Sequence, residues 1–102
     1  MYFANRNTRH AFAIFQDTIC DGTVPTWRDE NGFPIAYATE REAQIEIAEM
    51  VIEHMRQFIA GEREFDEVVT EGDFVLPVDV WPDGTIQTED GARFGSDNPA
   101  DQ

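Results

Sequence analysis

The longest regular pattern of apolar and polar positions runs from Thr39 to Ala60 and has the period of an α-helix. Thr39 and Glu42 have the spacing of a capping box, in which the threonine hydroxyl accepts a hydrogen bond from the amide of the third helical residue. Gly61 can take the left-handed conformation that commonly follows the last helical residue. The pattern therefore predicts a helix over about residues 39–60.

The apolar residues of this helix cover an arc of about 220°, which is wider than the roughly 100° stripe that packs on one sheet. One side consists of Ala43, Ile47, Met50, Val51, His54 and Phe58. The flank beside it consists of Ile45, Ala48, Ile52, Met55 and Ile59. We expect either that loops and the C-terminal segment cover this flank, or that Ile45, Ile52 and Ile59 form a partner surface, most simply in a homodimer.

Three shorter patterns precede the helix. Residues 10–15 are apolar on both alternating faces, which is typical of an interior strand. Residues 16–24 contain turn-forming aspartate and glycine. Residues 26–28 and 33–37 flank an Asn-Gly pair and predict a hairpin, with prolines that favour short or edge strands.

The chain after the helix alternates between polar connectors and short apolar runs. Residues 65–69 predict a short helical turn on the core. Residues 74–81 predict a strand in which Pro77 marks an edge position or a bulge, because proline donates no ladder hydrogen bond. After a Pro-Asp-Gly turn, residues 85–88 predict its partner strand.

This order of elements predicts an α+β fold. We expect an antiparallel sheet of four to five strands with the one long helix, about residues 39–60, packed on one face. Residues 1–94 are expected to form a single domain. The composition of residues 95–102 predicts a disordered acidic tail.

The net charge of the 102-residue chain is −14, from 21 acidic and 7 basic residues. A field of this sign repels phosphates, so neither nucleic acid nor a membrane surface is an expected direct partner. A basic or nucleic-acid-binding protein is the expected partner instead. The lone Cys20 has no internal disulfide partner, which favours a reducing compartment and a cytoplasmic location.

No residue pattern predicts catalysis. Neither His10 nor His54 has a further ligand at metal-binding spacing. The negative charges of Asp17 and Asp21 beside Cys20 disfavour a nucleophilic thiolate there. We therefore expect a protein that is not an enzyme and that binds no cofactor and no metal.

Acidic residues concentrate on the polar side of the helix and in the connector that follows it. Residues three and four apart are neighbours on a helix surface, so the helical members form a row. This predicted acidic face consists of Glu42, Glu46, Glu49, Glu53, Glu62, Glu64, Asp66, Glu67, Glu71 and Asp73. A solvated helix face followed by a solubilising loop is the alternative interpretation.

The runs FPIAYATEREAQIEIAEMV and VLPVDVWPDGTI resemble small acidic accessory proteins of phages, plasmids and other mobile elements. The resemblance covers about residues 10–90, assigns no functional residue, and implies inhibitors of the anti-restriction or anti-CRISPR kind. We therefore expect a non-enzymatic acidic protein that engages the nucleic-acid-binding surface of a partner, as a DNA mimic acting on a defence nuclease or CRISPR complex. A structural or regulatory homodimer with no nucleic-acid-related role is the alternative.

Overall fold

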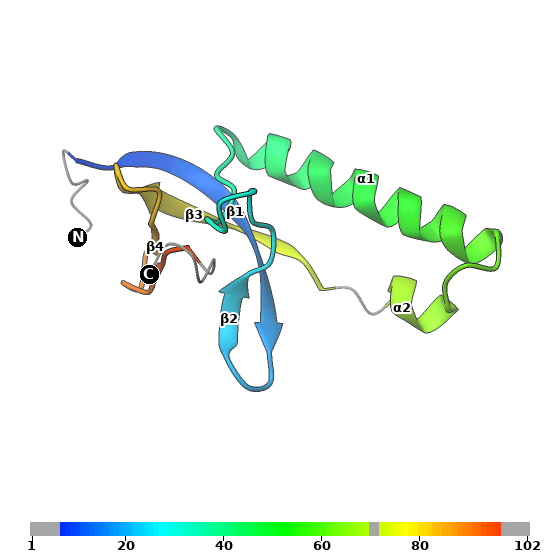
Figure 1. The fold of residues 1–102 in the computed structure, drawn as a ribbon. Helices are drawn as coiled ribbons and strands as arrows, with labels where there is room; N and C mark the ends of the chain where they lie inside the picture. The colour runs from blue at the N-terminus through cyan, green and yellow to red at the C-terminus, as the bar shows by residue number, and fades with distance from the viewer. Residues whose placement is uncertain (1–6, 70–71, 97–102) are drawn as a thin grey trace.

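The structure is a computed structural model that describes residues 7–69 and 72–96, and its α+β architecture confirms the predicted fold class. Five antiparallel strands form one sheet in the order β2-β1-β3-β4-β5, and one long helix lies along one face of that sheet (Figure 1). The strands are β1 (Arg9–Thr18), β2 (Gly22–Pro25), β3 (Phe74–Val80), β4 (Ile86–Thr88) and β5 (Arg93–Phe94). The helices are α1 (Glu40–Ile59) and α2 (Phe65–Val69).

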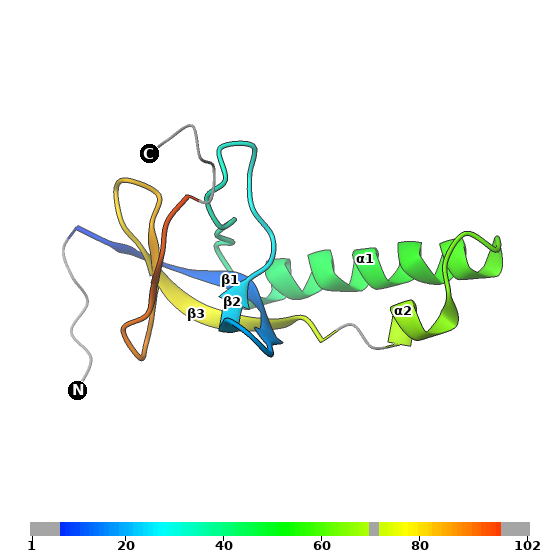
Figure 2. The same cartoon turned by 60° about the horizontal axis from the view of Figure 1, so that its bottom comes forward.

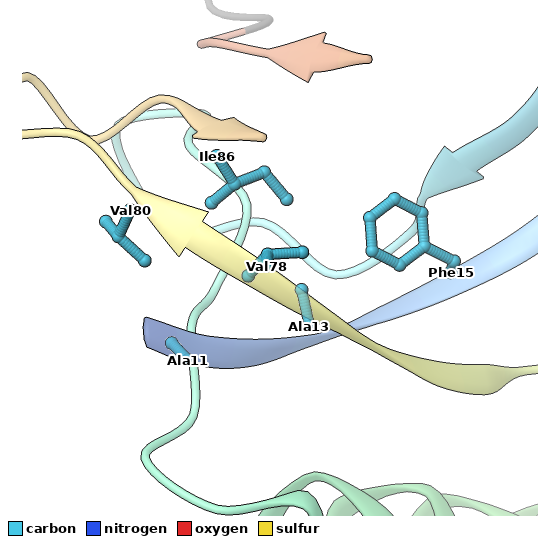
Figure 3. Packing of buried hydrophobic residues seen from close by; sticks show 6 residues of the cluster. All are labelled: Ala11, Ala13, Phe15, Val78, Val80 and Ile86. Carbon is cyan, nitrogen blue, oxygen red and sulfur yellow. The ribbon is translucent and has the colours of Figure 1, made fainter. Parts of the chain in front are cut away.

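The core lies on the face of the sheet opposite α1. Successive side chains of a strand point to opposite faces, so Ala11, Ala13 and Phe15 of β1 share one face, and all three are buried. Their cross-strand partners on β3 are Val78, Leu76 and Phe74, respectively. The buried cluster seen in Figure 3 consists of Ala11, Ala13, Phe15, Val78, Val80 and Ile86. β1 is therefore the interior strand that its two apolar faces predicted.

The other face of the sheet carries α1. Ile14 of β1 points to this side and is 1% exposed. α1 contacts β1 and β3, and Ala43 is its one fully buried residue. The helix is thus held on the sheet mainly through its first turns.

The turn-forming residues noted over residues 16–24 form the turn of a hairpin, and strand residues lie on both sides of it. β1 continues to Thr18 and β2 begins at Gly22, so that the two strands form a tight hairpin. The Thr18 hydroxyl donates to the Gly22 carbonyl at 2.9 Å and accepts from the Asp21 amide at 3.0 Å. Gly22 has φ of 71°, which supplies the left-handed residue of the turn. The Thr18 side chain, of a residue type that often bonds to the backbone in loops, makes the hydrogen bonds that close this hairpin.

The hairpin predicted over residues 26–37 forms as a loop that is closed by two short backbone pairings. The Asp29 amide donates to Phe33 at 2.8 Å, and the Ile35 amide donates to Trp27 at 3.0 Å. The Arg28 guanidinium holds this loop to the segment after β5 by donating to the Gly95 carbonyl at 2.7 Å. The disordered tail predicted over residues 95–102 thus begins with a hydrogen-bonded residue, and its residues 97–102 lie outside the described residues.

Pro77 sits in an interior strand, where an edge or a bulge was expected. Phe12, which faces Pro77 across the β1–β3 pair, exchanges both of its backbone hydrogen bonds with Tyr37, at 2.9 and 2.7 Å. Phe12 and Pro77 are therefore a non-hydrogen-bonded pair, and the proline nitrogen points away from β1. β4 pairs with β3 only from Val78 onward. No ladder donor is missed at Pro77, because β4 does not reach that far.

The long helix confirms the predicted element to within one residue at each end. The Thr39 hydroxyl accepts from the Glu42 amide at 3.1 Å, as the capping pattern requires. Gly61 has φ of 81° directly beyond the helix. The C-terminal half of α1 projects beyond the sheet, and α2, the predicted helical turn, packs against this end (Figures 1 and 2). Val68 of α2 is buried there, while Phe65 is 55% exposed.

Candidate interaction surface

Helix α1 has three distinct faces, and only one of them packs on the sheet. At about 100° per residue, the sheet face is centred on buried Ala43 and half-buried Ile47, Met50 and His54. A row of glutamates lies roughly 110° to one side of it. A stripe of exposed apolar residues lies roughly 140° to the other side.

The glutamate row consists of Glu42, Glu46, Glu49 and Glu53. These residues fall within an arc of about 60° and span about 16 Å along the helix axis. Glu42, Glu49 and Glu53 are exposed. Arg56 approaches the end of the row, with its Nη1 3.7 Å from Glu53 Oε2, but both side chains are largely exposed and such a pair stabilises little. The row therefore keeps a strongly negative field.

Glu46 is the one member of the row that is half-buried. It lies near Tyr37, and burial, followed by the negative charge of Glu46, raises the pKa of the Tyr37 hydroxyl above its ordinary value. Tyr37 is bonded through its backbone to Phe12 of β1. Glu46 therefore lies beside the sheet, whereas Glu53 is further along α1 toward its projecting end.

The connector places further carboxylates at the far end of the row. The Arg63 Nε donates to Gln57 Oε1 at 2.8 Å, and its Nη1 donates to Glu67 Oε2 at 3.3 Å. Gln57 is one turn beyond Glu53 on nearly the same side of α1. The exposed connector acids near this end are Glu62, Glu64, Asp66 and Glu67. Eight of the ten predicted acidic-face residues therefore belong to the arm formed by α1 and α2.

Two of the ten predicted residues are not part of this arm. Asp73 is half-buried beside β3 and accepts a hydrogen bond from the Thr26 hydroxyl at 3.3 Å. It lies with Glu40 and Gln44, on the side of α1 away from the row. Glu71 lies outside the described residues.

The second exposed face of α1 is apolar. We name it the isoleucine stripe, and it comprises the three isoleucines of the predicted flank with the two residues between them. Its members are Ile45, Ala48, Ile52, Met55 and Ile59, all exposed. Ile52 and Met55 are each 48% exposed, and Ile59 is 81% exposed. No described loop covers the stripe, so the expectation that loops wrap the flank was wrong for the part of the chain that the structure describes.

The residues considered for catalysis do not meet. Cys20 is exposed in the β1–β2 turn, whereas His10 lies at the opposite end of β1. His54 is on α1. Among the described residues, no group of three histidine, cysteine or acidic side chains is placed to hold a metal ion.

A shallow pocket of about 430 Å³ opens at one end of the core face. Phe74, Leu76 and Phe94 form its apolar floor, and Asp17 and Asp90 stand at its rim. Each aspartate accepts from a neighbouring threonine hydroxyl, Asp17 from Thr23 and Asp90 from Thr88. Asp17 is thereby held to its cross-strand partner on β2, and Asp90 is held in the turn between β4 and β5.

Asp79 is the buried acidic residue of the sheet, at 8% exposure. Its Oδ1 is 3.9 Å from His10 Nδ1, too far for a hydrogen bond. Burial, followed by the charge of Glu89, raises the pKa of the Asp79 carboxyl above its ordinary value. The folded state thus holds the Asp79 proton more tightly than the unfolded state.

Replacing Asp79 with asparagine is expected to stabilise the fold at neutral pH. Because the folded pKa is raised, the stability linked to this group is complete below the unfolded pKa of about 3.9 and is lost as pH rises through the folded value. The free energy of unfolding in urea should therefore be higher for D79N than for wild type at pH 7, and the difference should shrink toward pH 3. A variant that is less stable than wild type at pH 7 would contradict this.

No protein-family model, curated protein or solved structure matches this chain. Neither described helix is long and apolar enough to cross a lipid bilayer. The chemistry of the exposed faces of α1 is therefore what bears on function.

Proposed function

We propose that this chain is a non-enzymatic acidic binding protein whose glutamate row engages a basic, nucleic-acid-binding surface of a partner protein. The observation that carries the proposal is the row itself. Its carboxylates stand on one side of a helix that projects from the sheet, with further acidic residues at its far end. Glu53 and the connector acids are on the projecting end and are open to a partner, whereas Glu42 and Glu46 are on the first turns of α1, which pack on the sheet.

The spacing of the row is close to that of a phosphate backbone. Four carboxylates over about 16 Å give one charge per 5 Å or so, compared with one per ~3.4 Å along a single DNA strand. At physiological ionic strength, charges beyond about 8 Å are largely screened. The local density of the row, more than the net charge of −14, would then determine which basic surface it fits.

More specifically, we propose that the chain is a DNA mimic that inhibits a defence nuclease or a CRISPR complex. The support for this proposal is the charge spacing together with the resemblance to acidic accessory proteins of mobile elements. Such proteins would occupy a groove lined with lysine and arginine that otherwise holds phosphates. A mimic of this kind competes with nucleic acid for its partner.

The competition gives a direct test. The full chain is immobilised, exposed to extract of the native host, and eluted either with a 30-bp duplex or with a salt gradient. We expect nucleic-acid-binding proteins to be released by the duplex and by 0.5 M salt, and mass spectrometry identifies them. Bound proteins that are eluted by neither the duplex nor 0.5 M salt would count against the proposal.

A further inference from the structure

The isoleucine stripe has the spacing of a coiled-coil seam. Its members follow one another at intervals of three, four, three and four residues, so Ile45, Ile52 and Ile59 take one core position of the heptad, and Ala48 and Met55 take the other. A seam of this kind packs against another helix. All five of its members are exposed, from 41% at Ile45 to 81% at Ile59 among the large side chains.

The domain is also less compact than its length predicts. Its radius of gyration is 15.2 Å, whereas a compact chain of 100 residues has about 13 Å. The difference agrees with the projection of α1 and α2 beyond the sheet (Figure 2). The arm thus exposes apolar surface at a distance from the core that could cover it.

The exposed apolar area of the stripe is about half of what a standard interface buries on each partner. Phe58 and Phe65 pack on each other, with ring centroids 5.2 Å apart, but Phe58 lies on the side of α1 nearer the sheet and does not belong to the stripe. At about 200 Å² for a fully exposed large side chain, the exposed fractions of Ile45, Ile52, Met55 and Ile59 offer roughly 450 Å². Monomers rarely leave a larger apolar patch open, and a standard interface buries about 800 Å² per partner. The stems of the flanking charged residues can supply the remainder.

We propose that the isoleucine stripe is a homodimer interface in which two copies of α1 pack antiparallel. In this register Ile52 lies beside Met55 of the second copy, and Ala48 lies beside Ile59 of the second copy. The contact is isologous, so each pairing occurs twice. Small Ala48 faces large Ile59, which lets the two helices approach evenly.

The charges beside the seam select this orientation. Glu49 and Arg56 occupy equivalent flanking positions, and the antiparallel register brings each next to the other residue of the second copy, which gives two opposite-charge pairs. A parallel pair would set Glu49 and Arg56 against Gln44 and Val51, which carry no charge. It would also place the two acidic sheet domains side by side, whereas the antiparallel pair places them at opposite ends.

The dimer would gather the acidic charge on one side. The two-fold axis runs perpendicular to the helix pair, so it leaves both glutamate rows on the same side of the dimer. The rows then run antiparallel to each other. The interface itself does not depend on the proposed function, because the stripe and the row are separate faces of α1.

The mass of the full chain in solution tests the dimer. Sedimentation equilibrium from 1 to 200 µM is expected to give a dimer for wild type and a monomer, with at least about 100-fold weaker association, for Ile52→Glu, because the dimer would bury two unpaired carboxylates. Ile19→Glu is the matched control, since Ile19 is fully exposed in the β1–β2 turn, and it should remain dimeric. Wild type that stays monomeric at 200 µM, or an Ile52→Glu variant that dimerises like wild type, would overturn the proposal.

Cross-linking tests the orientation. Ala48→Cys and Ile59→Cys are made as two separate chains, each also carrying Cys20→Ser, and one chain has a tag that changes its mass. After mixing and mild oxidation, the antiparallel register predicts disulfides between the two different chains. Disulfides only between like chains would show a parallel pair and overturn the register.

Discussion

Replacing Phe15 with alanine is expected to leave most of the chain unfolded at 37 °C. Phe15 is completely buried on the core face of the sheet and is the largest of the fully buried side chains. Its ring meets Phe94 edge-on, with centroids 5.7 Å apart, and so ties β1 to the last strand. Truncating a buried phenylalanine typically costs about 3–5 kcal/mol.

This loss is large relative to the free energy of unfolding expected for the domain. Small domains have free energies of unfolding of about 5–15 kcal/mol, and here α1 contributes a single fully buried residue, Ala43. The core is therefore nearly confined to one face of the sheet, which places the stability near the low end of that range.

Urea unfolding followed by circular dichroism at 25 °C and 37 °C measures the effect of F15A. Ile19→Ala is the control, because it removes a side chain of similar apolar character that is fully exposed, and its unfolding curve should overlay that of wild type. A loss below about 1 kcal/mol for F15A would mean that the cluster around Phe15 is not what holds the sheet together.

The long helix was predictable because all its signals are local. The Thr39 cap, the 3.6-residue period and the Gly61 stop lie within one stretch of chain, and each has the predicted geometry in the structure. The glutamate row was predictable for the same reason, since helical spacing alone places its members on one side.

The strand predicted over residues 85–88 is confirmed as β4 (Ile86–Thr88). The strands β2 and β5 were not predicted, because their own residues do not favour a strand and each is stabilised only by pairing with the strand before it. β2 contains Gly22 and Pro25, which disfavour a strand, yet it pairs with β1 in a tight hairpin. β5 is two residues long and forms only because β4 is beside it. Pro77 suggested an edge strand because proline has no amide to donate. The local sequence does not show that β4 pairs with β3 only from Val78 onward, which leaves Pro77 without a neighbour on that side.

Tertiary placement also separated residues that the sequence grouped. Asp73 belongs to the same acidic run as the connector carboxylates, but the start of β3 turns it toward Thr26 and away from the row. The width of the apolar arc of α1 was evident from the sequence. Which part of the arc the sheet would cover was not, because that depends on where the helix crosses β1 and β3.

Reversing three charges of the row is expected to abolish partner binding. In the variant Glu46→Lys, Glu49→Lys and Glu53→Lys, three attractive positions become repulsive toward a basic surface, and like-charge juxtaposition at an interface is strongly unfavourable. We expect affinity for the duplex-eluted partner to fall at least about 1,000-fold at 0.15 M salt. The slope of log affinity against log salt concentration should also flatten, because fewer ions are released on binding.

The control must carry the same change in net charge elsewhere on the molecule. Asp21→Lys, Glu30→Lys and Glu89→Lys provide it, because all three residues are exposed in turns of the sheet domain and lie outside the row. If local charge density determines recognition, this control should lose less than about 10-fold, since screening weakens distant charges. Equal losses in the two variants would show that the partner responds only to net charge, and the glutamate row would then be a solvated helix face.

Dimerisation must be followed in the same variants, because Glu49 also flanks the isoleucine stripe. Single reversals at Glu46 and Glu53 separate the two roles, since neither residue pairs with the second copy in the proposed register. If both single variants remain dimeric and still lose affinity, the row binds the partner directly. If affinity for the partner falls only in variants that sediment as monomers, the partner requires the dimer formed by the isoleucine stripe. The charge reversals would then act by preventing dimerisation.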